Sequence, residues 1–108
     1  MATTAKRFAQ ALIATTVTTH YIVPAATTSI LKDVAIANTL TTSFAPRVHI
    51  VASGSAASSA NMLTADLTIA GRFHFHDLYF QVMNTGDTLQ SIANSAQGTL
   101  HASGVEIT

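Results

Sequence analysis

Two histidines, separated by a single residue, lie in the segment GRFHFHDLYF of a 108-residue chain. In a β-strand, residues i and i+2 point to the same face, so His74 and His76 would present their imidazoles side by side. Imidazole is a common ligand of zinc and other transition metals, and a third ligand would have to come from His49, His101 or Asp77. The pair therefore raises the hypothesis of a metal-dependent enzyme.

The sequence around the pair does not complete a metal site. Jelly-roll enzymes of the cupin type add a glutamate a few residues after an H-x-H pair and a further histidine on a later strand. The residues after His76 read DLYFQVMNTGD, and the only glutamate of the chain is Glu106. We therefore predict no metal and no other cofactor. We expect both histidines on the outward or subunit-facing side of a strand whose Phe73 and Phe75 fill the core.

Other catalytic arrangements are not indicated. The serine-rich segment SGSAASS lacks the G-x-S-x-G pattern of a nucleophile elbow. The five acidic residues occur singly, not as a pair placed for general acid–base catalysis. The chain has no cysteine and no glycine-rich phosphate loop. We predict that the protein is not an enzyme and binds no small-molecule substrate.

Charged side chains are scarce. Asp, Glu, Lys and Arg make up 9% of the chain, against about 25% in a typical soluble domain, and five basic residues balance five acidic ones. Without a basic excess the main attraction for nucleic acid is missing, and no apolar run approaches the roughly 20 residues that cross a bilayer. Because a solitary protein normally keeps a charged surface, we predict that other subunits cover much of this one. The alternative is a monomer kept soluble by hydroxyl groups.

Alternating β-branched residues predict strands, with no helix beyond a turn near residues 6–10. Neither face of the strand SILKDVAIANT is cleanly polar, which favours a strand covered on both sides. The apolar positions change parity after Phe75, so we expect a bulge or corner around His76 and Asp77. The fold class is all-β, a single antiparallel β-sandwich or jelly-roll-like domain of seven to eight strands. The strands are predicted over residues 12–24, 29–39, 45–53, 62–70, 73–82, 88–94 and 99–108.

The chain is predicted to divide into an N-terminal arm, residues 1–12, and a sandwich domain, residues 13–108. The arm precedes the sandwich and is the segment that we expect to reach a partner. Its candidate interface residues, and those on the sandwich, are charged, aromatic or histidine side chains: Lys6, Arg7, Phe8, His20, Tyr21, His74, His76 and Tyr79.

Short structural motifs occur along nearly the full length of the chain. They are KRFAQALIATTVTTHYIVPAATTSILKDVAIANT, VHIVASGSAASSAN, NTGDTLQSIAN and ASGVEIT. With these motifs the chain resembles a family of small β-sandwich structural proteins from the virions of tailed bacteriophages. The resemblance implies a head- or tail-associated virion component that is assembled in the bacterial cytoplasm. The segment FHFHD departs from the family pattern, so the resemblance assigns no role to the histidines.

We therefore expect a capsid decoration or cement subunit on the outside of the phage head. It would contact copies of itself, as a trimer, and the major capsid protein. One alternative is an adaptor or receptor-binding module of the tail, neck or fibre, in which Tyr21 and Tyr79 would bind a host glycan. A third hypothesis is a metal-dependent jelly-roll enzyme that uses His74 and His76.

Overall fold

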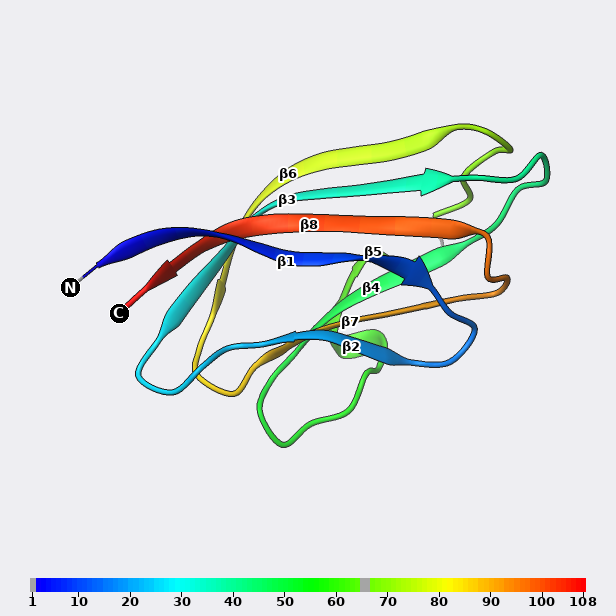
Figure 1. Cartoon of the computed structure of the whole chain (residues 1–108). Helices are drawn as coiled ribbons and strands as arrows, with labels where there is room; N and C mark the ends of the chain where they lie inside the picture. The colour runs from blue at the N-terminus through cyan, green and yellow to red at the C-terminus, as the bar shows by residue number, and fades with distance from the viewer. Residues whose placement is uncertain (1, 65–66) are drawn as a thin grey trace.

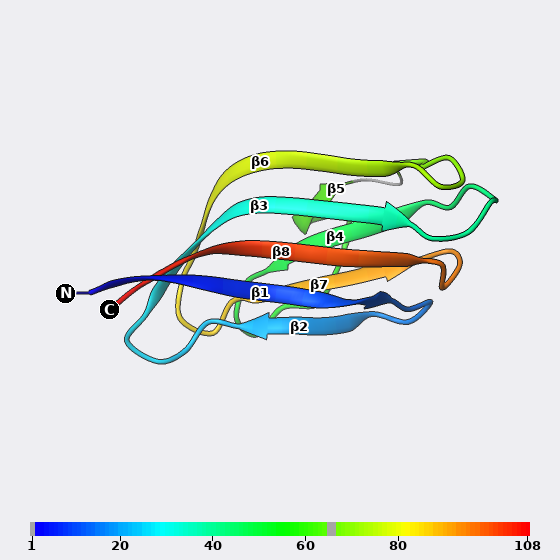
Figure 2. The same ribbon diagram turned by 45° about the horizontal axis from the view of Figure 1, so that its top comes forward.

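The computed structural model describes residues 2–64 and 67–108 and contains eight β-strands in two sheets (Figure 1). One sheet has the strand order β1-β8-β3-β6, and the other has the order β2-β7-β4-β5. Figure 2 shows β6, β3, β8 and β1 side by side. The paired strands are antiparallel, which confirms the predicted β-sandwich. The strands are β1 (Thr3–Ile13), β2 (Thr18–Ile22), β3 (Thr28–Asn38), β4 (Pro46–Val51), β5 (Met62–Thr64), β6 (His74–Met83), β7 (Thr88–Ala93) and β8 (Gly98–Ile107).

The connections between the strands form a jelly roll. The chain doubles back between β4 and β5, so that β4 pairs with β5, β3 with β6, β2 with β7 and β1 with β8. This doubled ribbon is wound into two facing sheets, which is the jelly-roll arrangement of an eight-stranded sandwich. The helical structure in the described residues is one 3-10 turn at Ser59–Asn61, and none of it is long and apolar enough to cross a bilayer.

Phe44, the bulkiest of the fully buried side chains, lies outside the eight strands. It forms an isolated bridge with Ile69, whose N–H donates to the Phe44 carbonyl at 2.8 Å. Gly98 lies against the ring, because a Cβ at that position would come within 2.1 Å of Phe44 Cζ. Around this ring, alternate strand residues turn inward to complete the core, among them Ile13, Leu31, Ile36, Met83, Leu89 and Leu100.

The N-terminal segment differs most from its prediction. Thr3–Ile13 forms strand β1, which pairs with β8 along its length, where an arm over residues 1–12 and a helical turn were expected. The strand expected over residues 12–24 is divided, because β1 ends at Ile13 and β2 begins at Thr18. The physical reason is burial of Phe8 and Ile13 between the sheets. The division into an arm and a sandwich is therefore not present, and deletion of residues 1–12 would remove an edge strand.

The strand predicted over residues 62–70 is short. It is reduced to β5 and to the bridge of Ile69 with Phe44. Leu67, expected on the apolar face, is exposed, and Ala65 on the same expected face lies outside the described residues. The alternation in this segment therefore does not correspond to a buried strand face.

Three register irregularities lie at one level of the β1-β8-β3-β6 sheet. Phe8 is an extra residue in β1 at the Ala102–Ser103 step of β8, and Lys32 is an extra residue in β3 at the adjoining Ser103–Gly104 step. On β6, Tyr79 and Phe80 together oppose Lys32. Bulges bend a strand and increase its twist, and Figure 1 shows β3 and β6 changing direction together.

The bulge in β3 explains its mixed apolar pattern. Leu31 is buried before the bulge, whereas Val34 and Ile36 are buried after it. The strand was predicted to be covered on both sides, but it instead changes the set of alternate residues that it buries. The irregularity expected around His76 and Asp77 is present in this region of the sheet, but in β6 it lies farther along, at Tyr79 and Phe80.

A polar network anchors one end of the core. The Tyr21 hydroxyl donates to the Glu106 carboxylate and lies 2.7 Å from the hydroxyl of Ser29, which is fully buried. The Tyr21 ring stacks on Phe8 with 4.3 Å between the ring centroids. Burial and the hydrogen bond to Glu106 raise the pKa of Tyr21 to about 12. Tyr21 and Phe8, both predicted to face a partner, instead stabilise the core.

Replacing Phe8 tests its place in the core. Phe8 is 3% exposed, so Phe8→Ala should lower the free energy of unfolding by about 3–5 kcal/mol. Leu12→Ala is the matched control on the same strand, because Leu12 is 54% exposed and should cost less than about 1 kcal/mol. Denaturant unfolding of both variants measures the difference. Equal losses would contradict burial of Phe8 in the sandwich.

The Tyr21 network predicts a loss of stability in alkali. The folded chain keeps the Tyr21 proton until about pH 12, whereas an unfolded tyrosine loses it near pH 10.0. The folded state therefore binds more protons in this window, so the contribution of Tyr21 is complete below pH 10.0 and declines as the pH rises to about 12. Denaturant unfolding across this window should show a steeper decline for the natural chain than for Tyr21→Phe. Parallel declines would show that the network is not responsible.

Candidate functional site

A shallow depression lies on the outer face of the β1-β8-β3-β6 sheet, close to the bulges. Ala35, which lines the depression, lies between the buried residues Val34 and Ile36. Because side chains alternate along a strand, Ala35 and the depression face outward. The depression has a volume of about 540 Å³. Its floor consists largely of small residues, so the bend of the strands leaves a hollow there; among them are Ala5, Ala35, Ser103 and Gly104.

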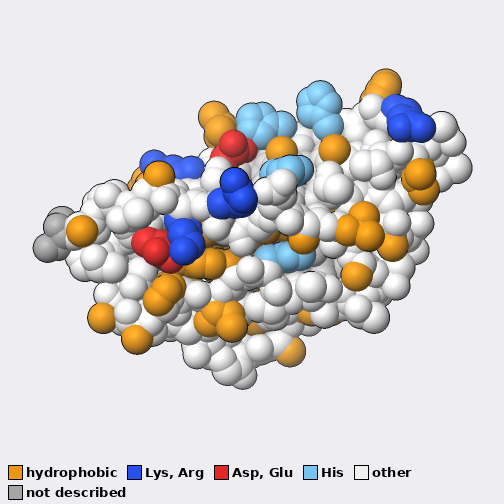
Figure 3. Space-filling model, in the orientation of Figure 1, with side chains coloured by type: hydrophobic (Ala, Val, Ile, Leu, Met, Phe, Trp, Pro, Cys, Tyr) orange, Lys and Arg blue, Asp and Glu red, His pale blue; other side chains and the backbone are white. Residues whose placement is uncertain are grey.

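The depression is mainly basic. Lys6 and Arg7 from β1 and Lys32 from β3 line it, which are three of the five Lys and Arg residues of the chain. His101 from β8 adds an imidazole, and Asp33 is the acidic group in the lining. Figure 3 shows charged and histidine side chains gathered mainly over this sheet. A concave surface with an excess of one charge attracts groups of the opposite charge.

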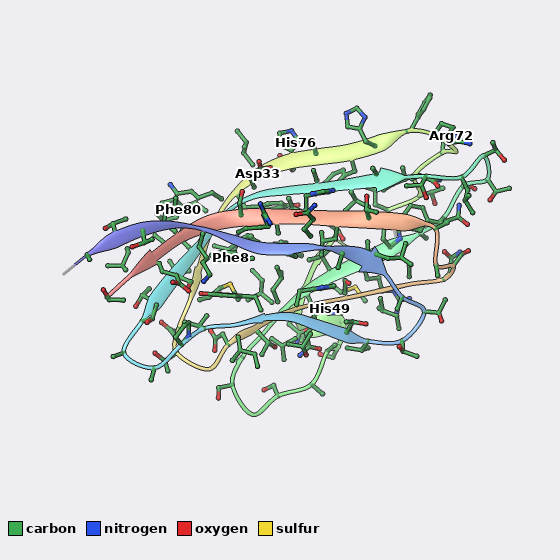
Figure 4. All side chains as sticks on the ribbon, viewed as in Figure 1. Phe8, Asp33, His49, Arg72, His76 and Phe80 are labelled. Atoms are coloured by element: carbon green, nitrogen blue, oxygen red, sulfur yellow. The ribbon has the colours of Figure 1, made fainter. Side chains whose placement is uncertain are left out.

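His74 and His76 both lie exposed on this outer face, one pleat apart. His76 Nε2 is 2.6 Å from Asp33 Oδ1, and Figure 4 shows the two side chains together on the upper sheet. Both groups are solvent-exposed, so their attraction contributes at most about 1 kcal/mol to folding. The outward position expected for both histidines is confirmed.

The structure does not complete a metal site at this pair with any of the three candidate third ligands. His49 is buried in β4 of the other sheet, where its Nδ1 lies 2.8 Å from Asn61 Oδ1. His101 and His76 both pair with Ala35 from opposite sides, so they lie two strands apart, roughly 10 Å. The Asp77 carboxylate accepts the backbone N–H of Leu78 at 2.8 Å. Among residues 2–64 and 67–108, no three His, Asp or Glu side chains are placed to share a metal ion.

An apolar stripe runs along β6, the edge strand of the same sheet. It consists of Leu78, Phe80 and Val82, which are 72%, 64% and 53% exposed, and of Phe73 just before the strand, which is 66% exposed. Lys32 Nζ lies 4.7 Å from the centroid of the Phe80 ring. We call these four apolar residues the β6 stripe. No charged residue belongs to it, so the sheet combines a basic hollow with an apolar edge.

The position of Phe73 corrects its prediction as a core residue. A turn precedes β6, in which Arg72 has a φ of +62° and the Phe73 N–H donates to the Ala70 carbonyl at 3.1 Å. Because Phe73 lies in this turn and not in the strand, the alternation of β6 does not direct its side chain into the core. Phe75, inside the strand, is half-buried and packs against the core as predicted.

His20 makes a contact that the sequence did not indicate. Its Nε2 lies 2.5 Å from Ser91 Oγ, across the pairing of β2 with β7. Burial lowers the pKa of His20, which favours the neutral imidazole. A neutral histidine beside a serine is the geometry of an activated nucleophile, but Ser91 is fully buried and no substrate can reach it. The contact satisfies a buried hydroxyl group.

The predicted interface residues therefore occupy different environments. Tyr79 is half-buried against the core, and burial together with the negative charge of Asp77 raises its pKa. The sequence reasoning did not select Lys32 or Asp33 as interface residues, and it considered His101 only as a metal ligand; all three line the depression with Lys6 and Arg7. The sequence contained one signal for this site, the two adjacent charged residues Lys32 and Asp33 within an otherwise apolar strand. They lie at the bulge of β3. The exposed members of the predicted set are Lys6, Arg7, His74 and His76, and the core members are Phe8 and Tyr21.

Comparison with known proteins gives a likeness of fold. No protein-family model matches the chain, and no curated protein matches it. A chain in the solved structure of infectious bursal disease virus, Gx strain, is similar with a TM-score of 0.52 and 11% sequence identity. The likeness covers 97% of this chain and 31% of that chain, so this protein spans about a third of its length. The fold of this chain is therefore similar to part of a protein from a virus structure.

Proposed function

We propose that this protein is a non-enzymatic structural protein of a tailed-phage virion, an outer capsid decoration or cement subunit that stabilises the head. The observation that carries the proposal is the jelly-roll topology, which capsid domains share and which has a neighbour in a virus structure. The tailed-phage setting comes from the resemblance of the sequence motifs. The charge-poor surface supports the same proposal, because it favours contact with neighbouring subunits.

The proposed mechanism is mechanical. A cement subunit bridges neighbouring capsid proteins and buries surface across their junction, which stabilises by about 25 cal/mol for each Å² of apolar surface removed from water. The chain exposes 5656 Å², and a standard interface takes roughly 800 Å² from each partner. One subunit therefore has surface for several neighbours. The basic depression would contact an acidic segment of the capsid protein.

The rival location is the tail, neck or fibre. A receptor-binding module for host glycans needs an exposed aromatic side chain, because sugar rings bind against its face. Tyr21 is buried and Tyr79 is half-buried, so neither offers such a surface. This observation disfavours the glycan site that the sequence placed at the two tyrosines.

The number of copies in each particle tests the capsid position. Quantitative mass spectrometry of purified phage particles should find this chain in hundreds of copies, because a decoration subunit repeats with the capsid lattice. A few dozen copies or fewer would place it in the tail, neck or fibre. Absence from the particles would overturn the virion proposal.

The same particles test the basic depression. Lys6→Glu with Arg7→Glu should reduce occupancy by about tenfold or more, which corresponds to about 1.4 kcal/mol of binding free energy. The matched control is Arg72→Glu, because Arg72 is also exposed and basic but lies at the far end of β6 (Figure 4). Equal occupancy for both variants would show that the depression does not hold the partner.

A metal-dependent enzyme is the remaining alternative. Zn²⁺ or Co²⁺ added to the purified protein should leave its thermal unfolding temperature unchanged, because His74 and His76 lack a third ligand among the described residues. The variant His74→Ala with His76→Ala should respond to the metals as the natural chain does. Stoichiometric metal that disappears in the double variant would support a metal site and contradict the structural proposal.

A further inference from the structure

Three of the four edge strands in the described sheets are protected against pairing with another chain. β5 has three residues and β2 has five, and both have an irregular register. β1 is long, but it exposes Lys6 and Arg7 and contains the bulge at Phe8. Short length, charged side chains and bulges are the features by which natural proteins keep sheet edges from pairing.

The fourth edge strand, β6, is long and exposes apolar side chains. It runs for ten residues and pairs with β3 on one side. It has an irregularity at Tyr79 and Phe80 and one acidic residue, Asp77, but the exposed side chains of Leu78, Phe80 and Val82 are apolar. A long edge strand with exposed apolar side chains is a template for a strand of another chain. The β6 stripe is therefore the surface on which we expect another chain to bind.

We propose that β6 pairs antiparallel with β6 of a second copy about a two-fold axis, which joins two four-stranded sheets into one sheet of eight strands. The proposal rests on the proposed function, because it names the contact between copies of the subunit. The second copy is the occupant because its β6 is a long edge strand with the same exposed apolar side chains, and a two-fold contact is self-complementary. Zero net charge means that no long-range repulsion keeps the copies apart.

The residues of β6 fit such a pairing when it is centred on Tyr79. In an antiparallel pair of identical strands, Leu78 then lies opposite Phe80 of the second copy, and Val82 lies opposite His76 of the second copy. Asp77 lies opposite Gln81 of the second copy, so two acidic groups are not opposed. The contact buries Leu78 and Phe80 and pairs backbone groups along both edges, where the Leu78 N–H exchanges its bond to Asp77 for one across the contact.

The two-fold contact closes on itself and gives a dimer. The trimer expected from the sequence requires a different contact, so the mass of the particle in solution distinguishes the two. Sedimentation velocity of the full chain should give twice the chain mass of 11.3 kDa. Leu78→Lys with Phe80→Lys should give the mass of one chain, because the pairing would place lysines opposite lysines.

A matched control separates this effect from a general change of surface. Leu12→Lys with Val17→Lys also replaces two exposed apolar residues, but these lie in β1 and in the turn that follows it. This control should remain dimeric. Circular dichroism and the denaturant midpoint show whether each variant is folded, and only folded variants enter the comparison.

Disulfide formation tests the register independently. The natural chain has no cysteine, so introduced cysteines are the only ones present. Leu78→Cys with Phe80→Cys should form disulfide-linked dimers on mild oxidation, because opposite positions bring their Cβ atoms to about 4.5–5.5 Å. Leu12→Cys with Val17→Cys should remain largely unlinked under the same conditions.

The outcomes separate this contact from the proposed function. The pairing is overturned if the natural chain stays monomeric at high concentration. It is also overturned if a dimer or trimer persists after both lysine substitutions in β6. A monomer that is abundant on particles would refute the β6 contact and leave the virion function standing. A dimer through β6 that is missing from particles would refute the function and leave the contact standing.

Discussion

The bulges across the β1-β8-β3-β6 sheet are the constraint on which the rest of the structure depends. Phe8, Lys32 and the pair Tyr79–Phe80 lie at one level, where each strand departs from regular pairing. Because side chains alternate along a strand, an extra residue changes which of them face the core. The bulges therefore direct Phe8 inward and place Lys32 over the ring of Phe80 on the surface.

The same bend shapes the outer face. Small residues at the bend leave the depression open, and the basic residues of β1 and β3 surround it. Gly104 is required at this place, since a Cβ there would lie 1.9 Å from the Ile30 carbonyl oxygen. A hollow, a charge excess and an apolar edge thus arise together from one irregular region of one sheet.

The basic depression and the apolar β6 stripe stand out because the chain has few charged residues. In a chain with few ionic side chains, three basic residues around one hollow are a large share of the total. The apolar β6 stripe lacks the charged residues that usually prevent association of edge strands. We propose that both features contact other macromolecules. His20 and Ser91, by contrast, contact each other within the fold.

The sequence by itself determined the fold class. Alternation of β-branched residues at regular intervals specified strands, and the strands expected over residues 29–39, 45–53, 88–94 and 99–108 match β3, β4, β7 and β8. The spacing of His74 and His76 also placed them on one outward face. These properties are local, because they depend on the geometry of a single strand.

Only the tertiary structure decided how the strands are used. The sequence reasoning treated residues 1–12 as an arm, because nothing local shows that β1 pairs with β8 at the other end of the chain. It placed Phe73 in the core, since a turn at Arg72 cannot be read from alternation. The depression draws residues from β1, β3 and β8, and its existence depends on which strands become neighbours. Pairing between distant segments sets burial and exposure, and a local pattern contains no information about that pairing.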